Sequence, residues 1–275
     1  MKGLLYIVST PIGNLEDITL RALRTLKEVD IIAAEDTRHT RKLLTHYNIS
    51  RPMISYWGAR EKVKAEEVIE KLRDGLDVAL VTDAGTPGIS DPGAVVIRRA
   101  LEEGFEVIPV PGPSALVAAL SVSGLDTRSF VFYGFLKPKR TQRINMLQSI
   151  RHVKETLVFY EAPHRVLDTL EDILEVFGDR QCCVCHEITK MNEEFYRGTI
   201  SEVINRLSEA RIAGEYVLVI EGHKAEGITI DEAVDEVLNL MKQGLRRKEA
   251  VKQISGQYGI SQKQLYDQSL ERGER

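Results

Sequence analysis

Short apolar runs alternate with amphipathic stretches along most of the chain. The runs GLLYIVS, VDIIAA, LDVALVTD and FEVIPV each have the length and composition of a buried strand, and LRALRTLKE, between the first two, has the spacing of an amphipathic helix. Strands that alternate with helices in this way predict a mainly parallel sheet with helices on both faces. The N-terminal part of the chain is therefore expected to be an α/β domain.

The same alternation resumes after a loop of small residues, SVSGLDTRS at positions 121–129. This loop ends the predicted helix that starts at Pro113, and the strand FVFYGF follows it. The runs EEFYRGTI and GEYVLVIEG resemble antiparallel strands, so we expect the second sheet to be mixed. From about Ile228 the pattern is wholly helical. The predicted organisation is an N-terminal α/β domain at 1–121, a second α/β domain at 122–227 and a helical tail at 228–275.

The composition sets limits on size and location. A chain of 275 residues has room for two apolar cores, and no apolar stretch approaches the ~18 residues that span a membrane. The N-terminal apolar run leads into a turn and not into a small-residue cleavage site. The three cysteines lie together in QCCVCHE, which excludes a disulfide framework and is typical of a reducing compartment. We therefore expect a cytoplasmic protein.

The cysteine cluster also raises the question of a metal site. Alternate side chains of a strand point to opposite faces, so Cys183 and Cys185 share one face while Cys182 and His186 share the other. Such an arrangement does not close a tetrahedral zinc cage. The expectation is free thiols packed as small hydrophobes, with no metal.

Basic residues are clustered although the net charge is −4. The stretch 137–154 holds Lys and Arg without any acid, and Lys and Arg also dominate the stretch 242–253. Such clusters are typical of surfaces that follow a phosphate backbone, and equally of solvated helix faces.

The sequence of the helical tail suggests an alternative hypothesis for the function of the chain. Gly259 lies in a short turn between two amphipathic segments that turn Ile254, Ile260 and Leu265 inward, as in helix-turn-helix modules. A DNA-binding regulator is therefore the non-enzyme hypothesis.

Three loops that follow predicted strands are poor in side chains: STPIGN, TDAGTPGISDPG and VPGPSA. The patterns GxxxxGK[ST] and GxGxxG are missing there, which removes the two common nucleotide cradles. Ligands bind at the carboxyl ends of strands in an open α/β sheet, and loops of this composition let backbone N–H and C=O groups make the contacts. Each loop alone is also consistent with a rigid turn, whereas three at one sheet edge favour a binding site.

Several motifs occur in an order that points to a family. STPIGNLEDIT, EDTRHTRKLL, DAGTPGISDPG, PVPGPSA, FYGFL, FYEAPHR, EITK and GEYVLVI together resemble the bacterial 16S ribosomal RNA ribose 2′-O-methyltransferases of the tetrapyrrole-methylase superfamily, over about residues 3–222. The resemblance implies two α/β domains with S-adenosylmethionine bound between them, and commonly a homodimer. It also implies that the methyl acceptor is the ribose 2′-hydroxyl of a cytidine in the decoding region of 16S rRNA, presented as RNA or as the small ribosomal subunit. Methylation of a tetrapyrrole or another small molecule is the alternative that keeps the cofactor, and the basic clusters favour RNA.

The resemblance further implies a set of residues around the cofactor. Because the sulfonium is cationic, its site needs carbonyl oxygens and a carboxylate and not an anion nest. The positions that match the family's cofactor-binding segments are Pro11 in the first loop, Asp83, Gly85, Thr86 and Pro87 in the second, Ser114 and Ala115 in the third, Tyr160, Glu161 and Ala162 in the second domain, and Gly214 before the last strand.

Methyl transfer to a hydroxyl requires polar side chains near the reacting atoms. In-line methyl transfer requires oxygen, carbon and sulfur to align, and a group that accepts the hydroxyl proton. Glu35, Asp36 and Arg38 follow a predicted strand and form the first candidate cluster. The alternative is that Asp36 or Thr37 only caps the helix that follows, with the arginines solvated.

Two further clusters are candidates. Glu161 and Arg165 in YEAPHR bring a carboxylate beside an arginine, and His164 between them is also suited to a first helical turn. The resemblance places the polar residues of HEITK, Glu187, Thr189 and Lys190, toward the RNA.

Two departures from the family pattern affect this site. Trp57, Gly58 and Ala59 stand where the family usually has a polar Tyr-His-Glu-x-Asn-like stretch, and His186 stands where an arginine is usual. Any catalytic role of those positions is therefore lost or moved in this chain.

Overall fold

The structure is a computed structural model that describes residues 2–58, 61–224 and 229–273. The chain divides into two compact units, Met1–Glu221 and Gly222–Arg275, and the first of them contains both sheets. No helix in the described ranges is long and apolar enough to cross a membrane. The predicted domain boundary between 121 and 122 stays a prediction, and the one between 227 and 228 lies outside the described residues.

The first sheet is parallel and has the strand order β3-β2-β4-β1-β5. Its strands are β1 (Leu5–Val8), β2 (Ile31–Ala34), β3 (Met53–Ser55), β4 (Val78–Val81) and β5 (Val107–Val110). Every residue of β2 and β4 is buried because the sheet is covered on both faces, which explains their uninterrupted apolar sequences. The predicted parallel N-terminal sheet is confirmed.

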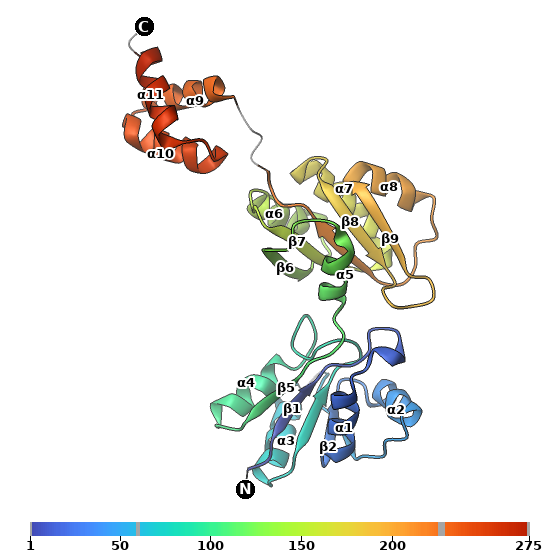
Figure 1. The fold of residues 1–275 in the computed structure, drawn as a ribbon. Helices are drawn as coiled ribbons and strands as arrows, with labels where there is room; N and C mark the ends of the chain where they lie inside the picture. Colours follow the sequence, from blue (N-terminus) through green and yellow to red (C-terminus); the bar gives the residue numbers. More distant parts are fainter. Residues whose placement is uncertain (1, 59–60, 225–228, 274–275) are drawn as a thin grey trace. The chain divides into compact units, whose positions relative to one another are not determined.

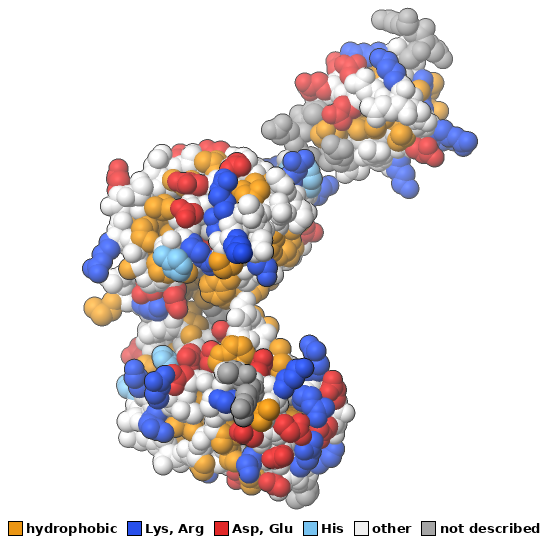
Figure 2. All heavy atoms as spheres, turned by 180° about the vertical axis from the view of Figure 1, so that it is seen from behind, with side chains coloured by type: hydrophobic (Ala, Val, Ile, Leu, Met, Phe, Trp, Pro, Cys, Tyr) orange, Lys and Arg blue, Asp and Glu red, His pale blue; other side chains and the backbone are white. Residues whose placement is uncertain are grey.

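Two pairs of helices cover this sheet (Figure 1). α1 (Leu20–Glu28) and α2 (Thr37–His46) pack on one face, where Leu26 and Leu43 are buried, and α3 (Glu61–Arg73) and α4 (Ala94–Glu102) pack on the other. The short helix η1 (Leu15–Asp17) precedes α1. The outer side of α2 is basic, and Lys, Arg and His side chains gather over it in Figure 2.

The second sheet is mixed, with the order β6-β7-β10-β8-β9. Its strands are β6 (Phe130–Phe135), β7 (Thr156–Glu161), β8 (Gln181–His186), β9 (Glu194–Thr199) and β10 (Tyr216–Ile220). β6 and β7 are parallel, whereas β10 pairs antiparallel with β7 and β8, and β9 pairs antiparallel with β8. The predicted mixed sheet and the two-sheet α/β class are confirmed.

Helices cover the two faces of this sheet unequally. α6 (Arg140–Ile150), α7 (Val166–Phe177) and α8 (Ile200–Ser208) bury the larger cluster, around Leu147, Leu170 and Val203, with the short helix η2 (Pro163–Arg165) leading into α7. α5 (Ala115–Ser123) covers the other face with Ala119 and Leu120. α5 follows a strand of the first sheet, yet it packs on the second sheet.

The cysteines alternate across β8 as predicted. Cys183 and Cys185 belong to the cluster under α5, and Cys182 belongs to the cluster on the opposite face. His186 ends the strand, where its Nε2 lies 2.8 Å from the Ala213 carbonyl oxygen and its ring stacks on Tyr216 at 4.6 Å. His186 therefore has a local packing role.

The second unit contains α9 (Ile230–Lys242), α10 (Arg247–Tyr258) and α11 (Gln262–Gly273). Gly259 ends α10 with a φ of 69°, and Ile254 and Leu265 are buried between the helices while Ile260 packs against them. The predicted helical tail with an inward apolar face is confirmed.

Candidate functional site

The three side-chain-poor loops meet because they follow adjacent parallel strands. β4, β1 and β5 are neighbours, so the loops after them leave the same edge of the sheet. Thr10 and Gly85 exchange two backbone hydrogen bonds, of 2.9 Å and 3.1 Å, and join the first two loops. A Cβ at Gly112 would lie 2.9 Å from Ser9 Cβ, so the third loop approaches the first too closely for a side chain. The glycines therefore serve packing between loops as well as access to a ligand.

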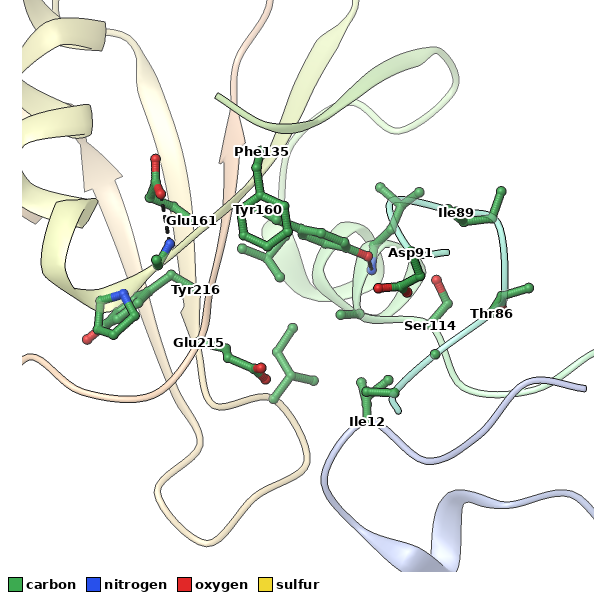
Figure 3. A pocket seen from close by; sticks show the side chains of 18 residues that line it. Ile12, Thr86, Ile89, Asp91, Ser114, Phe135, Tyr160, Glu161, Glu215 and Tyr216 are labelled. Carbon is green, nitrogen blue, oxygen red and sulfur yellow. Dashed lines mark hydrogen bonds between the residues drawn. The ribbon is translucent and has the colours of Figure 1, made fainter. Parts of the chain in front are cut away.

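A cavity of about 570 Å³ opens beside these loops. One wall comes from the loops of the first sheet, and the other comes from the ends of β7 and β10 in the second sheet (Figure 3). Its volume lies within the range of small-molecule and cofactor sites, ~300–1,000 Å³. Seven of the residues predicted to surround the cofactor line it: Gly85, Thr86, Ser114, Ala115, Tyr160, Glu161 and Ala162.

The other four predicted cofactor residues lie elsewhere. Pro11 and Asp83 line a second cavity described below, while Pro87 and Gly214 line neither of the two. Gly214 has a φ of +69°, and a Cβ there would lie 2.3 Å from the Glu187 side chain. Gly214 therefore makes room for Glu187.

Tyr160 is held in one orientation at the first cavity. Its hydroxyl oxygen accepts a hydrogen bond of 3.2 Å from Leu116 N, and its ring meets Phe132 and Phe135 edge to face. Burial raises the pKa of the Tyr160 hydroxyl. The ring is therefore a rigid, neutral wall, suited to pack against an apolar planar group.

Asp91 is the feature of this cavity that the sequence reasoning missed. Its carboxylate faces the cavity beside Ser114 (Figure 3). Burial, and then the carboxylates of Glu35, Asp83 and Glu215, raise the pKa of Asp91 to about 6. Burial also raises the pKa of Asp83. Concentrated negative charge of this kind favours a cation in the cavity.

Other lining residues were also missed, and the signals for them differ in strength. Asp91 is part of the loop TDAGTPGISDPG, so its position after β4 was a signal that could have found it. Ile12 and Glu215 come from two different loops, and only the tertiary fold brings them together. Each lies directly beside a motif residue, but adjacency along the chain does not say which side chain enters a cavity.

The first catalytic cluster has strong local partners. Glu35 accepts hydrogen bonds from Thr82 Oγ1, at 2.5 Å, and from Asp83 N, at 3.2 Å. Asp36 caps α2 and accepts hydrogen bonds of 2.8 Å from Arg38 N and Arg38 Nη2, and these bonds hold the pKa of Asp36 well below its ordinary value. Among the described residues, neither cavity lining includes Glu35, Asp36 or Arg38. The geometry of Asp36 is therefore that of a helix cap, which was the alternative to a catalytic role.

The second catalytic cluster is buried. Glu161 accepts hydrogen bonds from Ala162 N at 2.8 Å, from Arg165 Nη2 at 2.5 Å and from Thr169 Oγ1 at 2.8 Å. The Glu161 side chain has no exposed surface, and that of Arg165 is 15 % exposed. These bonds fix the turn from β7 into α7 behind the wall of the first cavity.

The third cluster lies across from the first loop. Lys190 Nζ is 2.7 Å from Glu187 Oε1 and 3.0 Å from Glu215 Oε2. Its side chain covers Gly13, where a Cβ would lie 2.4 Å from Lys190 Cγ. Thr189 Oγ1 donates a hydrogen bond of 2.5 Å to Asp17. The segment from Glu187 to Lys190 thus contacts the loop after β1.

A second cavity, of about 470 Å³, lies between this segment, the first loop and α2. Its walls include His39 and Lys42 from α2, Asp83, Lys190 and residues of the first loop. It shares the residues Ile12, Ala84 and Glu215 with the first cavity, so the two are adjacent.

The structure describes part of the departure at residues 57–59 and one member of a basic cluster. Trp57 is 41 % exposed and Gly58 has a φ of +126°, while Ala59 lies outside the described residues. In the basic stretch 137–154, Arg143 is buried and pairs with Asp172 at 2.6 Å. Arg143 is therefore not part of a phosphate-binding surface.

Solved structures that superimpose on this two-sheet fold include methyltransferases. The uroporphyrin III C-methyltransferase of Thermus thermophilus superimposes with a TM-score of 0.58 at 19% identity, over 80% of this chain and 97% of that one. The cobalt precorrin-4 methyltransferase CbiF superimposes with a TM-score of 0.58 at 18% identity, over 79% of this chain and 94% of that one. Another structure of the Thermus thermophilus enzyme, complexed with S-adenosyl homocysteine, superimposes with a TM-score of 0.56 at 20% identity, over 80% of this chain and 97% of that one.

The sequence itself places the chain within that class. The profile of the Tetrapyrrole (Corrin/Porphyrin) Methylases matches residues 4–204, and the chain belongs to this family. Proteins called "Ribosomal RNA small subunit methyltransferase I" are similar over nearly their whole length. The one from Halalkalibacterium halodurans is 46% identical over 97% of this chain and 94% of that protein, and the one from Synechocystis is 46% identical over 98% of each. The one from Thermotoga maritima is 47% identical over 80% of this chain and 99% of that protein. The predicted family resemblance is confirmed.

Proposed function

We propose that this chain is an S-adenosylmethionine-dependent methyltransferase of small-subunit ribosomal RNA, and that its acceptor is the ribose 2′-hydroxyl of a cytidine in the decoding region of 16S rRNA. The observation that carries the proposal is the 46% identity, over 97% of the chain, with a relative that bears the rRNA methyltransferase name. Fold neighbours below 25% identity support the fold, whereas this relative supports the substrate. The finer statement, the cytidine 2′-hydroxyl, rests on the family resemblance.

The first cavity fits S-adenosylmethionine. That cofactor combines an apolar planar base with a cationic sulfonium and an ammonium group. The cavity combines the fixed ring of Tyr160 with the half-buried carboxylate of Asp91, and Gly85 leaves its backbone uncovered with a φ of +80°. An anion nest would suit a phosphate instead, and the acidic surroundings of Asp91 disfavour one.

We assign the cofactor to the residues that line this cavity: Gly85, Thr86, Ser114, Ala115, Tyr160 and Ala162. When bound, S-adenosylmethionine supplies a methyl group on a positively charged sulfur. The chain's own residues then bind the base, balance the positive charge and exclude water, which positions the methyl group for in-line attack. Glu35 acts indirectly by holding Thr82 and the backbone of Asp83.

A side-by-side methylation assay tests this function. Tritiated S-adenosylmethionine is supplied with isolated 16S RNA, with small ribosomal subunits and with a porphyrinogen. We expect label in one of the two RNA substrates and none in the porphyrinogen. Because a 2′-O-methyl group blocks alkaline cleavage of the following phosphodiester, the label should appear in an alkali-resistant dinucleotide whose first residue is cytidine. Label in the porphyrinogen alone would establish the tetrapyrrole alternative.

We also propose a cytoplasmic homodimer. The family resemblance supports the dimer, and the small-subunit substrate supports the location. Sedimentation equilibrium at several protein concentrations tests the dimer, and a monomer at all of them would refute it. A DNA-binding regulator would instead bind duplex DNA with sequence preference and transfer no methyl group.

A further inference from the structure

The site consists of two adjacent cavities that share part of their lining. In-line transfer requires the attacking oxygen and the departing sulfur to lie on opposite sides of the methyl carbon. If the cofactor occupied the first cavity and the acceptor the second, transfer between them would take place at the residues that both cavities share, Ile12, Ala84 and Glu215. An acceptor can approach that methyl group from the second cavity.

We propose that the second cavity receives the acceptor nucleoside of a single-stranded RNA segment, with the flanking phosphates against His39 and Lys42 and with Asp83 facing the ribose hydroxyl. The inference rests on the proposed function, and it adds to that function an acceptor subsite and the residues that form it. The family resemblance assigned Asp83 to the cofactor site, whereas this inference assigns it to the acceptor site.

The rim of the second cavity has the charge that a polynucleotide requires. His39 and Lys42 are three residues apart on α2, so their side chains lie on the same side of the helix, and both are exposed. Arg41 and His46 add to the basic surface that Figure 2 shows over α2. Within the described residues, no hydrogen bond or ion pair engages the side chains of His39 and Lys42. They are therefore available to phosphate oxygens.

The wall of this cavity contains a polar group without a protein partner. Thr40 is 2 % exposed, lines the cavity, and its Oγ1 has no hydrogen-bond partner among the described residues. A buried hydroxyl left in that state costs roughly 1–3 kcal/mol. A nucleoside oxygen or nitrogen in the cavity would supply the missing partner.

Asp83 is placed to accept a proton in the second cavity, next in sequence to Ala84 of the shared wall. It lines the second cavity, and its Oδ1 accepts a hydrogen bond of 3.2 Å from Asp36 N, which fixes its orientation. As the oxygen–carbon bond forms, the 2′-hydroxyl proton passes to the Asp83 carboxylate. The carbon–sulfur bond breaks at the same time, and its electron pair stays on sulfur as a neutral thioether. Burial raises the pKa of Asp83, which makes it a better proton acceptor than an ordinary aspartate.

The first test separates the two cavities by affinity. The variant His39→Ala/Lys42→Ala is compared with Lys62→Ala/Arg98→Ala, which removes two exposed basic residues from α3 and α4 on the opposite face of the sheet. We expect the first variant to raise KM for the RNA substrate at least tenfold and to reduce the salt slope by one to two units, since each phosphate contact contributes roughly one unit. Cofactor affinity by calorimetry should stay within about twofold in both variants. An unchanged KM in the α2 variant would overturn the inference.

Thr40→Val provides a variant of the same shape. Because it removes an unsatisfied buried hydroxyl, we expect a folded protein at least as stable as the original, with KM for RNA raised several-fold. A stable variant with unchanged KM would remove Thr40 from the acceptor site.

Asp83→Asn tests the chemistry. Single-turnover rates with saturating cofactor and RNA should fall by roughly 10²–10⁴-fold, and the rise of rate with pH on the acid side should disappear. Loss of cofactor affinity in Asp83→Asn, with an unaltered pH profile, would return Asp83 to the cofactor and overturn the inference. If the unaltered protein methylates neither RNA substrate, the proposed function fails as well, whereas transfer with unaffected variants overturns the inference alone.

Discussion

Acidic residues at the strand ends of the two sheets differ in how completely they are hydrogen-bonded. Glu161, at the end of β7, accepts three hydrogen bonds and is buried. Asp91 and Asp83, in the loop after β4, lie in cavities where burial raises the pKa of each, and neighbouring carboxylates raise it further. In the sequence, Glu161 stood in a catalytic and a cofactor-binding motif, whereas Asp83 stood in a cofactor-binding loop only, although both motifs bring acidic residues to a strand end.

The comparison indicates that the role of a carboxylate depends on its hydrogen-bond donors and on the charges around it. The carboxylate with three donors is held in place by the protein, whereas one among like charges gains by binding a cation or a proton. The second sheet therefore supplies a rigid wall, and the first sheet supplies the groups that meet the ligands. Each of the following variants tests one side of this comparison.

The largest effect is expected from the buried ion pair of the second sheet. Asp172→Ala leaves the guanidinium of Arg143 buried without its partner at 2.6 Å. Removing one member of a buried pair costs roughly 3–5 kcal/mol of the free energy of unfolding. Urea denaturation measures it, with Glu175→Ala as the control, because Glu175 pairs with the exposed Arg140. Equal losses in the two variants would contradict the assignment of a structural role to the buried pair.

The next effect is on the first cavity itself. Ala115→Leu places three more carbons into the cavity at the start of α5, and we expect cofactor affinity to fall about 100-fold, or ~2.7 kcal/mol. Val117→Leu on the same helix is the control, since Val117 is 60 % exposed. Gly85→Leu should act in the same direction with an added cost from its φ of +80°. Calorimetry that finds unchanged affinity in both cavity variants would place the cofactor elsewhere.

Much of this fold could be predicted from the sequence. The apolar run VALV of β4 is buried on both faces, so its pattern indicated a parallel sheet, and parallel strands bring their following loops to one edge. The packing of α5 could not be predicted, because ALVAALSVS is apolar on all sides and suits either sheet. The conformation of the loop after β8 could not be predicted either. Glu187 and Thr189 have φ values of 49° and 66°, and the sequence has no glycine at these positions to indicate a positive φ.

The site was predictable only in part for a related reason. Seven cofactor residues lie on one cavity because they belong to loops whose strands are neighbours. Asp91 lies in a motif that also makes a good turn, and Glu215 enters from the far sheet. Which side chains converge depends on the contact between the two sheets, and that contact cannot be predicted from a local sequence pattern.

A smaller effect, with a pH dependence, is expected at Asp91. Its pKa of about 6 lies above the ordinary value of 3.8, so the charged carboxylate destabilises the folded protein above about pH 6. That destabilisation is relieved as the pH falls through 6 toward 4. Asp91→Asn should therefore be more stable than the original protein at about pH 8, and the two should converge at about pH 4.

The same variant should bind the cofactor more weakly. With the carboxylate gone, affinity for S-adenosylmethionine should fall about tenfold at neutral pH, while affinity for the uncharged thioether product should change less. Thermal unfolding across pH and calorimetry with both ligands measure the two effects. Equal losses for the charged and uncharged ligands would show that Asp91 does not respond to the positive charge.

The smallest effect is expected at Asp36, which the sequence presented as a catalytic candidate. Its carboxylate caps α2 and pairs with Arg38, whose side chain is 87 % exposed. Asparagine caps a helix about as well as aspartate, and exposed ion pairs contribute little, so Asp36→Asn should keep both fold and cofactor affinity. Its single-turnover rate should stay within about twofold of the original, and the acid side of the pH profile should remain. Because Asp36 N donates to Asp83, a small change in rate with an intact profile would reflect orientation of Asp83. A large loss of rate together with loss of the acid side would instead make Asp36 the proton acceptor, and the contrast between carboxylates with several donors and those that face a cavity would fail at the residue where it is most directly tested.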